Sequence, residues 1–226
     1  MPISDRPSVR PAAVARWAAF GLAGLALSGC LPPGGSLAFR QGSAAVHAVR
    51  VSDNDVTIAG PKGYCVDPTS SRERPAGSFV MLGSCATLRG AGEGPGKPAV
   101  LTALVSPRSD PPLVPDPAQL ERFFRSDAGH AALAHDGNAD SVTLLSIVAE
   151  GPVLYLKLRD RSTGRPADLS DVAWRAIFPL ADRLVALSVT GHDDLPVADT
   201  DMRRTLDRFV AAVMAANAGP EGERDT

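Results

Sequence analysis

Short apolar runs separated by turn residues recur along this chain, and one longer stretch near its C-terminus repeats its apolar residues at helical spacing. Runs of this length bounded by Gly, Pro, Asp or Ser are typical of strands. They predict strands at residues 56–59, 78–82, 100–105, 142–148, 153–159, 174–180 and 184–190.

Two helices are predicted, one central and one C-terminal. The central helix begins after Asp116, because Asp116 can cap it, Pro117 suits the first helical position and Gln119 completes a capping box. Gly129 is expected to end it. The C-terminal helix spans residues 199–217. Its apolar stripe consists of Met202, Leu206, Phe209, Val210, Val213 and Met214.

The last four predicted strands form two hairpins, which turn at residues 149–152 and 181–183. Because hairpins build antiparallel sheets, the predicted fold is α+β: an antiparallel sheet built from hairpins, packed by the central and C-terminal helices. The length fits a single domain at residues 52–218, followed by a polar, disordered tail at 219–226.

The N-terminus has the layout of an export signal. Three arginines within the first sixteen residues precede an apolar stretch at residues 17–27, which is too short for a comfortable membrane span. Leu27-Ser28-Gly29-Cys30 follows and resembles the lipobox of bacterial lipoproteins. The resemblance implies that residues 1–29 are a signal peptide that is removed. It also implies that Cys30 receives a diacylglycerol and an N-acyl chain such as palmitate.

That resemblance implies a location as well. Two or three acyl chains anchor a protein stably, so the chain is expected on a membrane of the bacterial cell envelope, facing the periplasm. Leu31, where an Asp would favour inner-membrane retention, favours the outer membrane. The Pro- and Gly-rich run after Cys30 predicts a flexible tether over residues 30–51.

Cys65 and Cys85 are the remaining cysteines. Disulfides persist in exported proteins, so we expect these two to be bridged. The bridge would close a loop of about twenty residues and contribute about 3 kcal/mol in the chain-entropy model. A catalytic cysteine is the alternative. However, there is no C-x-x-C pair, and Gly83-Ser84-Cys85-Ala86 departs from the cysteine element of L,D-transpeptidases.

Composition excludes several functions. The 23 Lys and Arg against 25 Asp and Glu leave a net charge of −2, which argues against nucleic-acid binding. The glycine-rich segment at 90–98 lacks two requirements of a phosphate loop, since Ala91 replaces a glycine and Pro98 replaces Ser or Thr, so no nucleotide is expected. We also expect no other cofactor.

Metal binding is conceivable at one set of residues, although solvated loops are the favoured interpretation because no metal-binding spacing is present. This set comprises His135, Asp136, His192, Asp193 and Asp194.

The element order, with a Pro-Lys-Gly-Tyr turn at residues 61–64, resembles the Mog1/PsbP-like fold, whose members mostly act in binding and assembly. The G-Y-C-V-D and G-S-C elements resemble those of uncharacterised alphaproteobacterial lipoproteins. We therefore expect a lipid-anchored binding or assembly module with a protein partner in the envelope, and no enzymatic activity. Two alternatives stay open. An envelope hydrolase would bring His130 or His192 beside a free cysteine, and a small-molecule or metal carrier would have an apolar cavity under the final helix.

Overall fold

The computed structural model describes residues 46–90, 94–96, 98–110 and 116–218. The signal segment, Cys30, most of the predicted tether and the tail at 219–226 lie outside this part of the chain. Within it, no helix is both long and apolar enough to cross a bilayer.

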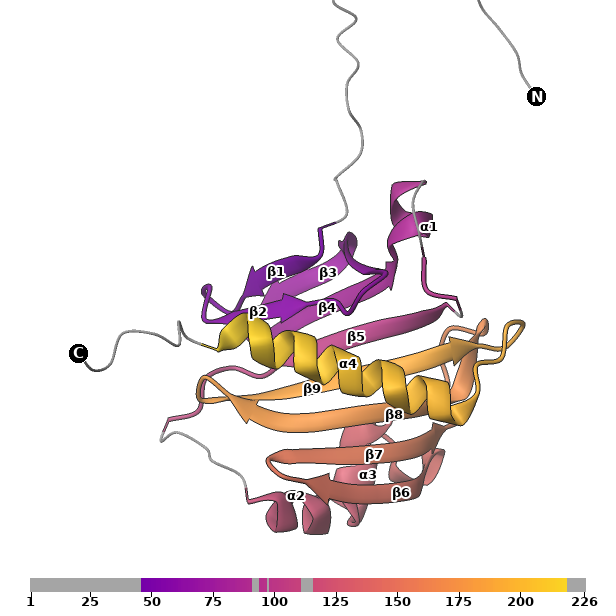
Figure 1. Cartoon of the computed structure of the whole chain (residues 1–226). Coiled ribbons are helices and arrows are strands. Elements are labelled where there is room, and N and C mark those ends of the chain that lie inside the picture. Colours follow the sequence, from indigo (N-terminus) through magenta and orange to yellow (C-terminus); the bar gives the residue numbers. More distant parts are fainter. Residues whose placement is uncertain (1–45, 91–93, 97, 111–115, 219–226) are drawn as a thin grey trace, which may run out of the picture. The chain divides into compact units, whose positions relative to one another are not determined.

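A seven-stranded antiparallel sheet forms the centre, in the order β3-β4-β5-β9-β8-β7-β6 (Figure 1). Its strands are β3 (Tyr64–Arg74), β4 (Gly77–Ser84), β5 (Ala99–Val105), β6 (Val142–Glu150), β7 (Val153–Asp160), β8 (Leu169–Leu180) and β9 (Arg183–His192). A separate hairpin pairs β1 (Ala48–Val51) with β2 (Val56–Ala59). The helices are α1 (Cys85–Arg89), α2 (Pro117–Phe124), α3 (Asp127–Leu133) and α4 (Asp199–Asn217), with a 3₁₀ turn at Ala139–Ser141. The predicted α+β class, with its antiparallel sheet and C-terminal helix, is confirmed.

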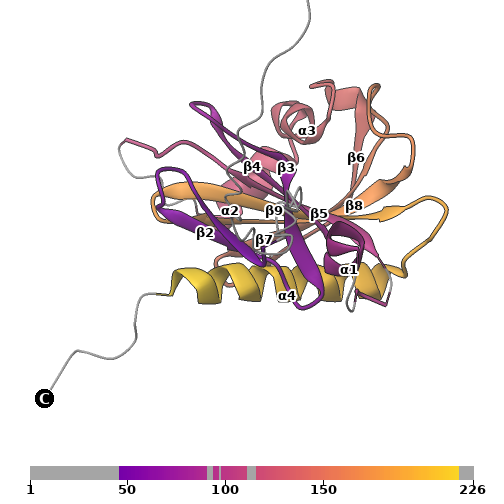
Figure 2. The ribbon, with the colours of Figure 1, turned by 90° about the horizontal axis from the view of Figure 1, so that it is seen from above.

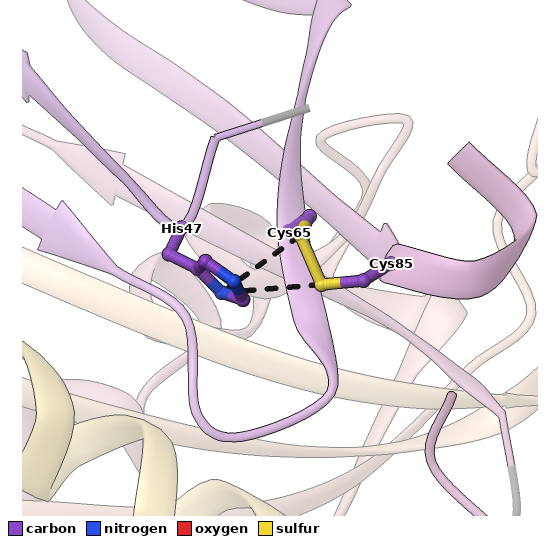
Figure 3. A group of neighbouring side chains, drawn as sticks. All are labelled: His47, Cys65 and Cys85. Carbon is purple, nitrogen blue, oxygen red and sulfur yellow. Dashed lines mark hydrogen bonds between the residues drawn. A yellow bond between two sulfur atoms is a disulfide. The ribbon is translucent and has the colours of Figure 1, made fainter. Parts of the chain in front are cut away.

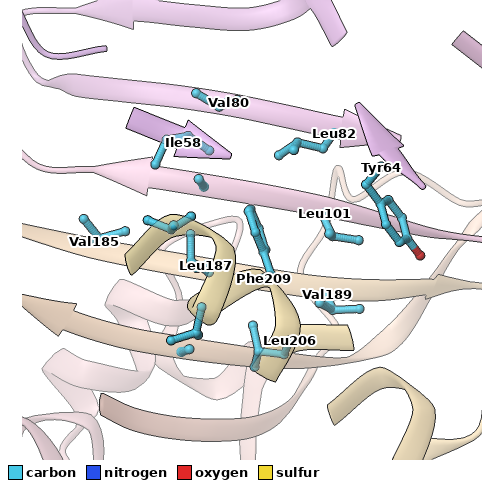
Figure 4. Close-up of a cluster of buried hydrophobic side chains, with 14 of the residues drawn as sticks. Ile58, Tyr64, Val80, Leu82, Leu101, Val185, Leu187, Val189, Leu206 and Phe209 are labelled. Carbon is cyan, nitrogen blue, oxygen red and sulfur yellow. The ribbon is translucent and has the colours of Figure 1, made fainter. Parts of the chain in front are cut away.

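The helix α4 covers one face of the sheet and packs against β9, β8 and the small β1–β2 hairpin (Figures 1 and 2). Leu206, Phe209 and Val213 of α4 are fully buried there, among side chains of β2, β4, β5 and β9 (Figure 4). This is the stripe that the helical spacing predicted. It contributes to the largest apolar core of the described residues.

Polar contacts fix the N-terminal end of α4 to the sheet. Asp199 accepts a hydrogen bond from the indole Nε1 of Trp174 at 2.8 Å and pairs with the Lys157 ammonium at 2.7 Å. The Arg203 guanidinium lies 3.7 Å from the ring centre of Tyr155. The Lys157 hydrogen bond is the main reason why the pKa of Asp199 is lowered. Trp174 is therefore a core anchor.

The helices α2 and α3 lie on the other face of the sheet (Figure 2) and cover β6, β7 and part of β8. The sequence predicted one helix here that stops at Gly129, and this was wrong. The helix α2 ends at Phe124, and the Ser126 hydroxyl then caps α3 by accepting from the Gly129 N–H at 3.2 Å. A Cβ at Gly129 would lie 2.0 Å from the Phe123 carbonyl oxygen. The glycine therefore permits close approach of the two helices rather than ending one.

The folded region also begins earlier than predicted. Residues 48–51, which the sequence assigned to the tether, form β1, and Val46 already pairs with Val66 of β3. The strand β3 itself was missed. Its register shifts between Asp67 and Arg72, where polar residues replace the apolar pattern.

Strands β4, β5 and β9 present a row of partly exposed side chains on the face opposite α4. These residues alternate along the strands with the side chains that are buried under α4. We call this surface the open face. It consists of Phe79, Met81, Thr102, Leu104, Leu184, Ala186 and Ser188. Leu104, at its centre, is 52% exposed.

Candidate functional site

The two cysteines that were predicted to pair lie at disulfide distance. Cys65 lies on β3 and Cys85 begins α1, with their Sγ atoms 2.08 Å apart and their Cα atoms 4.9 Å apart. Both side chains are buried. In this state neither sulfur is a thiolate, and the thiolate is the form that attacks a substrate or binds a metal.

His47 lies beside this pair (Figure 3). Its Nδ1 is 3.8 Å from the Cys65 sulfur and 3.9 Å from the Cys85 sulfur. The backbone holds it there, because the His47 carbonyl accepts from the Gly60 N–H at 2.8 Å. Sequence reasoning missed this neighbour because residue 47 was assigned to the tether. Within the described ranges, these three residues are the group whose His, Cys or acidic atoms lie close enough together to hold a metal ion.

The other histidines lie elsewhere. His130 is in α3, His135 follows that helix, and His192 ends β9, so the described structure does not place His130 or His192 in the cysteine cluster. Asp136 forms its hydrogen bonds within the loops around it. Its carboxylate accepts from the Asn138 N–H and from Ser141, Ser162 and Thr163. These bonds, with Asn138 first, lower the pKa of Asp136 to about 2. The carboxylate of Asp136 is thus an acceptor within these loops.

A polar cavity of about 580 Å³ lies where the β1–β2 turn meets β9. Buried Arg183 pairs with Asp55 at 3.1 Å, and Arg108 pairs with the same carboxylate at 2.5 Å. Hydrogen bonds from Arg108, and then from Arg183, lower the pKa of Asp55. The Glu73 carboxylate accepts from the Ser52 N–H. Because these charges pair with one another, the cluster fixes the β1–β2 turn to the sheet.

The open face contains a second cavity, of about 450 Å³, with largely apolar walls. Phe79, Leu104 and Ala186 lie directly opposite one another on three adjacent strands and form its floor. Exposed Arg72 and Arg74 lie at its rim. We call this cavity the apolar groove.

A third cavity, of about 340 Å³, lies between the C-terminal end of α3 and the sheet. Leu104 lines both this cavity and the apolar groove. Arg175 of β8 lines this cavity, which we call the arginine pocket. Burial lowers the pKa of Arg175, although the negative charge of Asp160 acts to raise it. Sequence reasoning assigned no role to Arg175, since no local motif marks it.

The carrier hypothesis expected its cavity beneath the C-terminal helix. The apolar groove and the arginine pocket instead lie on the opposite face, because fully buried side chains fill the space between α4 and the sheet.

The comparisons give no relative from which a role can be taken: no family profile, no curated protein and no solved structure matches this chain.

Proposed function

We propose that this chain is a lipid-anchored binding module of the bacterial cell envelope, attached through Cys30 and facing the periplasm, and that the open face is its binding surface. The outer membrane remains the favoured location because Leu31 follows the cysteine. The proposal assigns the chain no catalytic role.

One observation carries this proposal. The apolar groove exposes Phe79, Leu104 and Ala186 at the centre of the sheet, where side chains are otherwise buried. Exposed apolar surface that is gathered into a concavity, rather than scattered, is typical of binding sites. On the opposite face, α4 buries apolar side chains of β4, β5, β8 and β9 in the apolar core.

The occupant can be a partner protein or a small molecule. The second candidate, a small-molecule carrier, is favoured by the size of the two cavities. Volumes of about 450 and 340 Å³ fall within the range of pockets that enclose small ligands.

A photo-crosslinking amino acid at position 104 tests the proposal in intact cells. We expect light to attach an occupant to the full chain, and the mass of the adduct distinguishes a protein from a small molecule. Leu195 provides the matched control, because it is also an exposed leucine, at 55%, but lies just before α4. Equal labelling at positions 104 and 195, or no adduct at either, would contradict a binding role for the open face.

A further inference from the structure

The Arg175 side chain forms no ion pair and no hydrogen bond with the residues that the structure describes. Its Nε is shielded from solvent and unsatisfied. A partly buried charge without a partner lowers stability, and an arginine stays protonated at any physiological pH. The protein therefore retains a destabilising group at the edge of a cavity.

The carboxylate whose charge acts on Arg175 already accepts hydrogen bonds from other residues. Asp160, whose charge Arg175 senses, accepts from the Ser162 N–H at 2.9 Å and from the His135 N–H at 3.2 Å. These bonds tie its two carboxylate oxygens to the backbone at His135 and Ser162. Within the described residues, the guanidinium of Arg175 is thus left without an ion-pair partner.

The strand register places further polar groups beside Arg175. Ser188 of β9 lies directly opposite Arg175, and Thr102 of β5 lies directly opposite Ser188, so these three residues share one face of the sheet. Neither hydroxyl forms a hydrogen bond within the described structure. A guanidinium with hydroxyl groups beside it suits a carboxylate or a phosphate group, because each can donate to an anionic oxygen.

An apolar row runs next to this polar row. Phe79, Leu104, Ala186 and Ile177 succeed one another across β4, β5, β9 and β8, two residues along each strand from the polar row. Leu104 belongs to the walls of both cavities. A ligand that reaches from the arginine pocket into the apolar groove would therefore have a charged end and an apolar end.

We propose that the open face and the adjoining arginine pocket together bind an amphiphilic anion, with a single carboxylate or phosphate group at Arg175 and an acyl-like tail along the apolar groove. This inference rests on the proposed function, whose binding surface it uses. Arg175 supplies the charge recognition, and Leu104 and Phe79 bury the tail. Burial of the tail favours binding because its methylene groups leave water.

Photolabelling of the full lipidated chain in lipid nanodiscs tests this inference. The probes are decanoate and decanol, each with a diazirine at the end of its tail, so that they share the tail and differ in the headgroup, an anionic carboxylate in one and a neutral hydroxyl in the other. The variants are Arg175→Met, Arg175→Lys and Arg208→Met. Arg208 is an exposed residue of α4, on the far side of the sheet, and its replacement removes the same charge. Because every variant sees the same membrane, ratios between variants cancel partitioning of the probe into lipid.

We expect decanoate to label peptides of β5 and β9. We expect Arg175→Met to reduce this labelling at least about tenfold, which corresponds to about 1.4 kcal/mol. Arg175→Lys retains part of it, and Arg208→Met changes nothing. Labelling by decanol is the same in all variants. The melting temperature of Arg175→Met is not lowered, since the replacement removes an unpaired charge rather than a stabilising pair.

Three results would overturn the inference. Equal labelling by decanoate and decanol in the native chain would show that charge plays no part, while leaving an apolar binding surface intact. If inorganic phosphate displaces the decanoate probe at as low a concentration as unlabelled decanoate does, the tail adds no affinity and the pocket belongs to a free anion. No labelling of the open face by either probe would remove amphiphiles as ligands, and the crosslink at position 104 then decides the proposed function separately.

Discussion

Replacing Phe209 with alanine is expected to lower the free energy of unfolding by about 3–5 kcal/mol. Phe209 is fully buried where α4 crosses the sheet, among side chains that come from β2, β5 and β9 (Figure 4). Truncation removes apolar contacts and leaves a cavity that the surrounding strands cannot close, because each is held by its neighbours in the sheet.

Equilibrium unfolding in urea, followed by tryptophan fluorescence, measures this effect. Phe123→Ala is the matched control. Phe123 lies on α2 and is 43% exposed, with its ring centre 5.0 Å from that of Phe124 in an edge-to-face contact. Its truncation is therefore expected to lower the free energy of unfolding far less. If Phe209→Ala lowers the free energy of unfolding no more than Phe123→Ala does, the interpretation of α4 as the helix that closes the largest apolar core is wrong.

Replacing Cys30 with alanine is expected to abolish lipidation. Native protein should incorporate an alkyne-tagged palmitate and sediment with membranes, whereas Cys30→Ala should do neither. The physical reason is that stable attachment needs two or more acyl chains, and the proposed lipidation places all of them on this residue. The measurement is in-gel detection of the tag together with fractionation of the cells.

The control for Cys30→Ala is the double variant Cys65→Ser and Cys85→Ser. It removes the other two cysteines of the chain, and these lie within the folded domain. It should keep both the tag and the membrane association. If Cys30→Ala still carries the tag and still sediments with membranes, the lipoprotein proposal is wrong.

The sequence predicts local structure correctly wherever a few neighbouring residues determine it. Asp116 accepts from the Ala118 N–H at 3.1 Å and Pro117 opens α2, as their order along the chain predicts. The stripe of α4 was equally clear, because every member contributes to one helical face. The cysteine pair followed from the expected export of the chain and from the small number of cysteines.

Features that depend on long-range packing were missed. The strand β3 carries polar residues after Asp67 and is recognisable only by its pairing with β4. Gly129 looks like a helix stop in sequence, yet its role is set by a carbonyl from the preceding helix. Arg175 acquires significance only once three strands align Thr102, Ser188 and Arg175 across one face. No pattern within a single segment encodes that alignment.

The fold accounts for where a ligand can bind. The helix α4 and the β1–β2 hairpin cover one face of the sheet, and α2 and α3 cover only part of the other (Figures 1 and 2). On that face the uncovered strands include β4, β5 and β9, each of which is hydrogen-bonded to a neighbouring strand on both sides. A groove on such strands is preorganised, so little conformational entropy is lost when it is filled.

Native mass spectrometry of the protein, extracted gently from cell envelopes, tests the binding role most directly. The account predicts a chain that begins at an acylated Cys30, retains one disulfide, and carries a non-covalent ligand of low mass with an anionic group. The ligand should be released on denaturation and should be missing from Arg175→Met but present in Arg208→Met. Native protein without any ligand, or a ligand retained equally by both variants, would contradict the account.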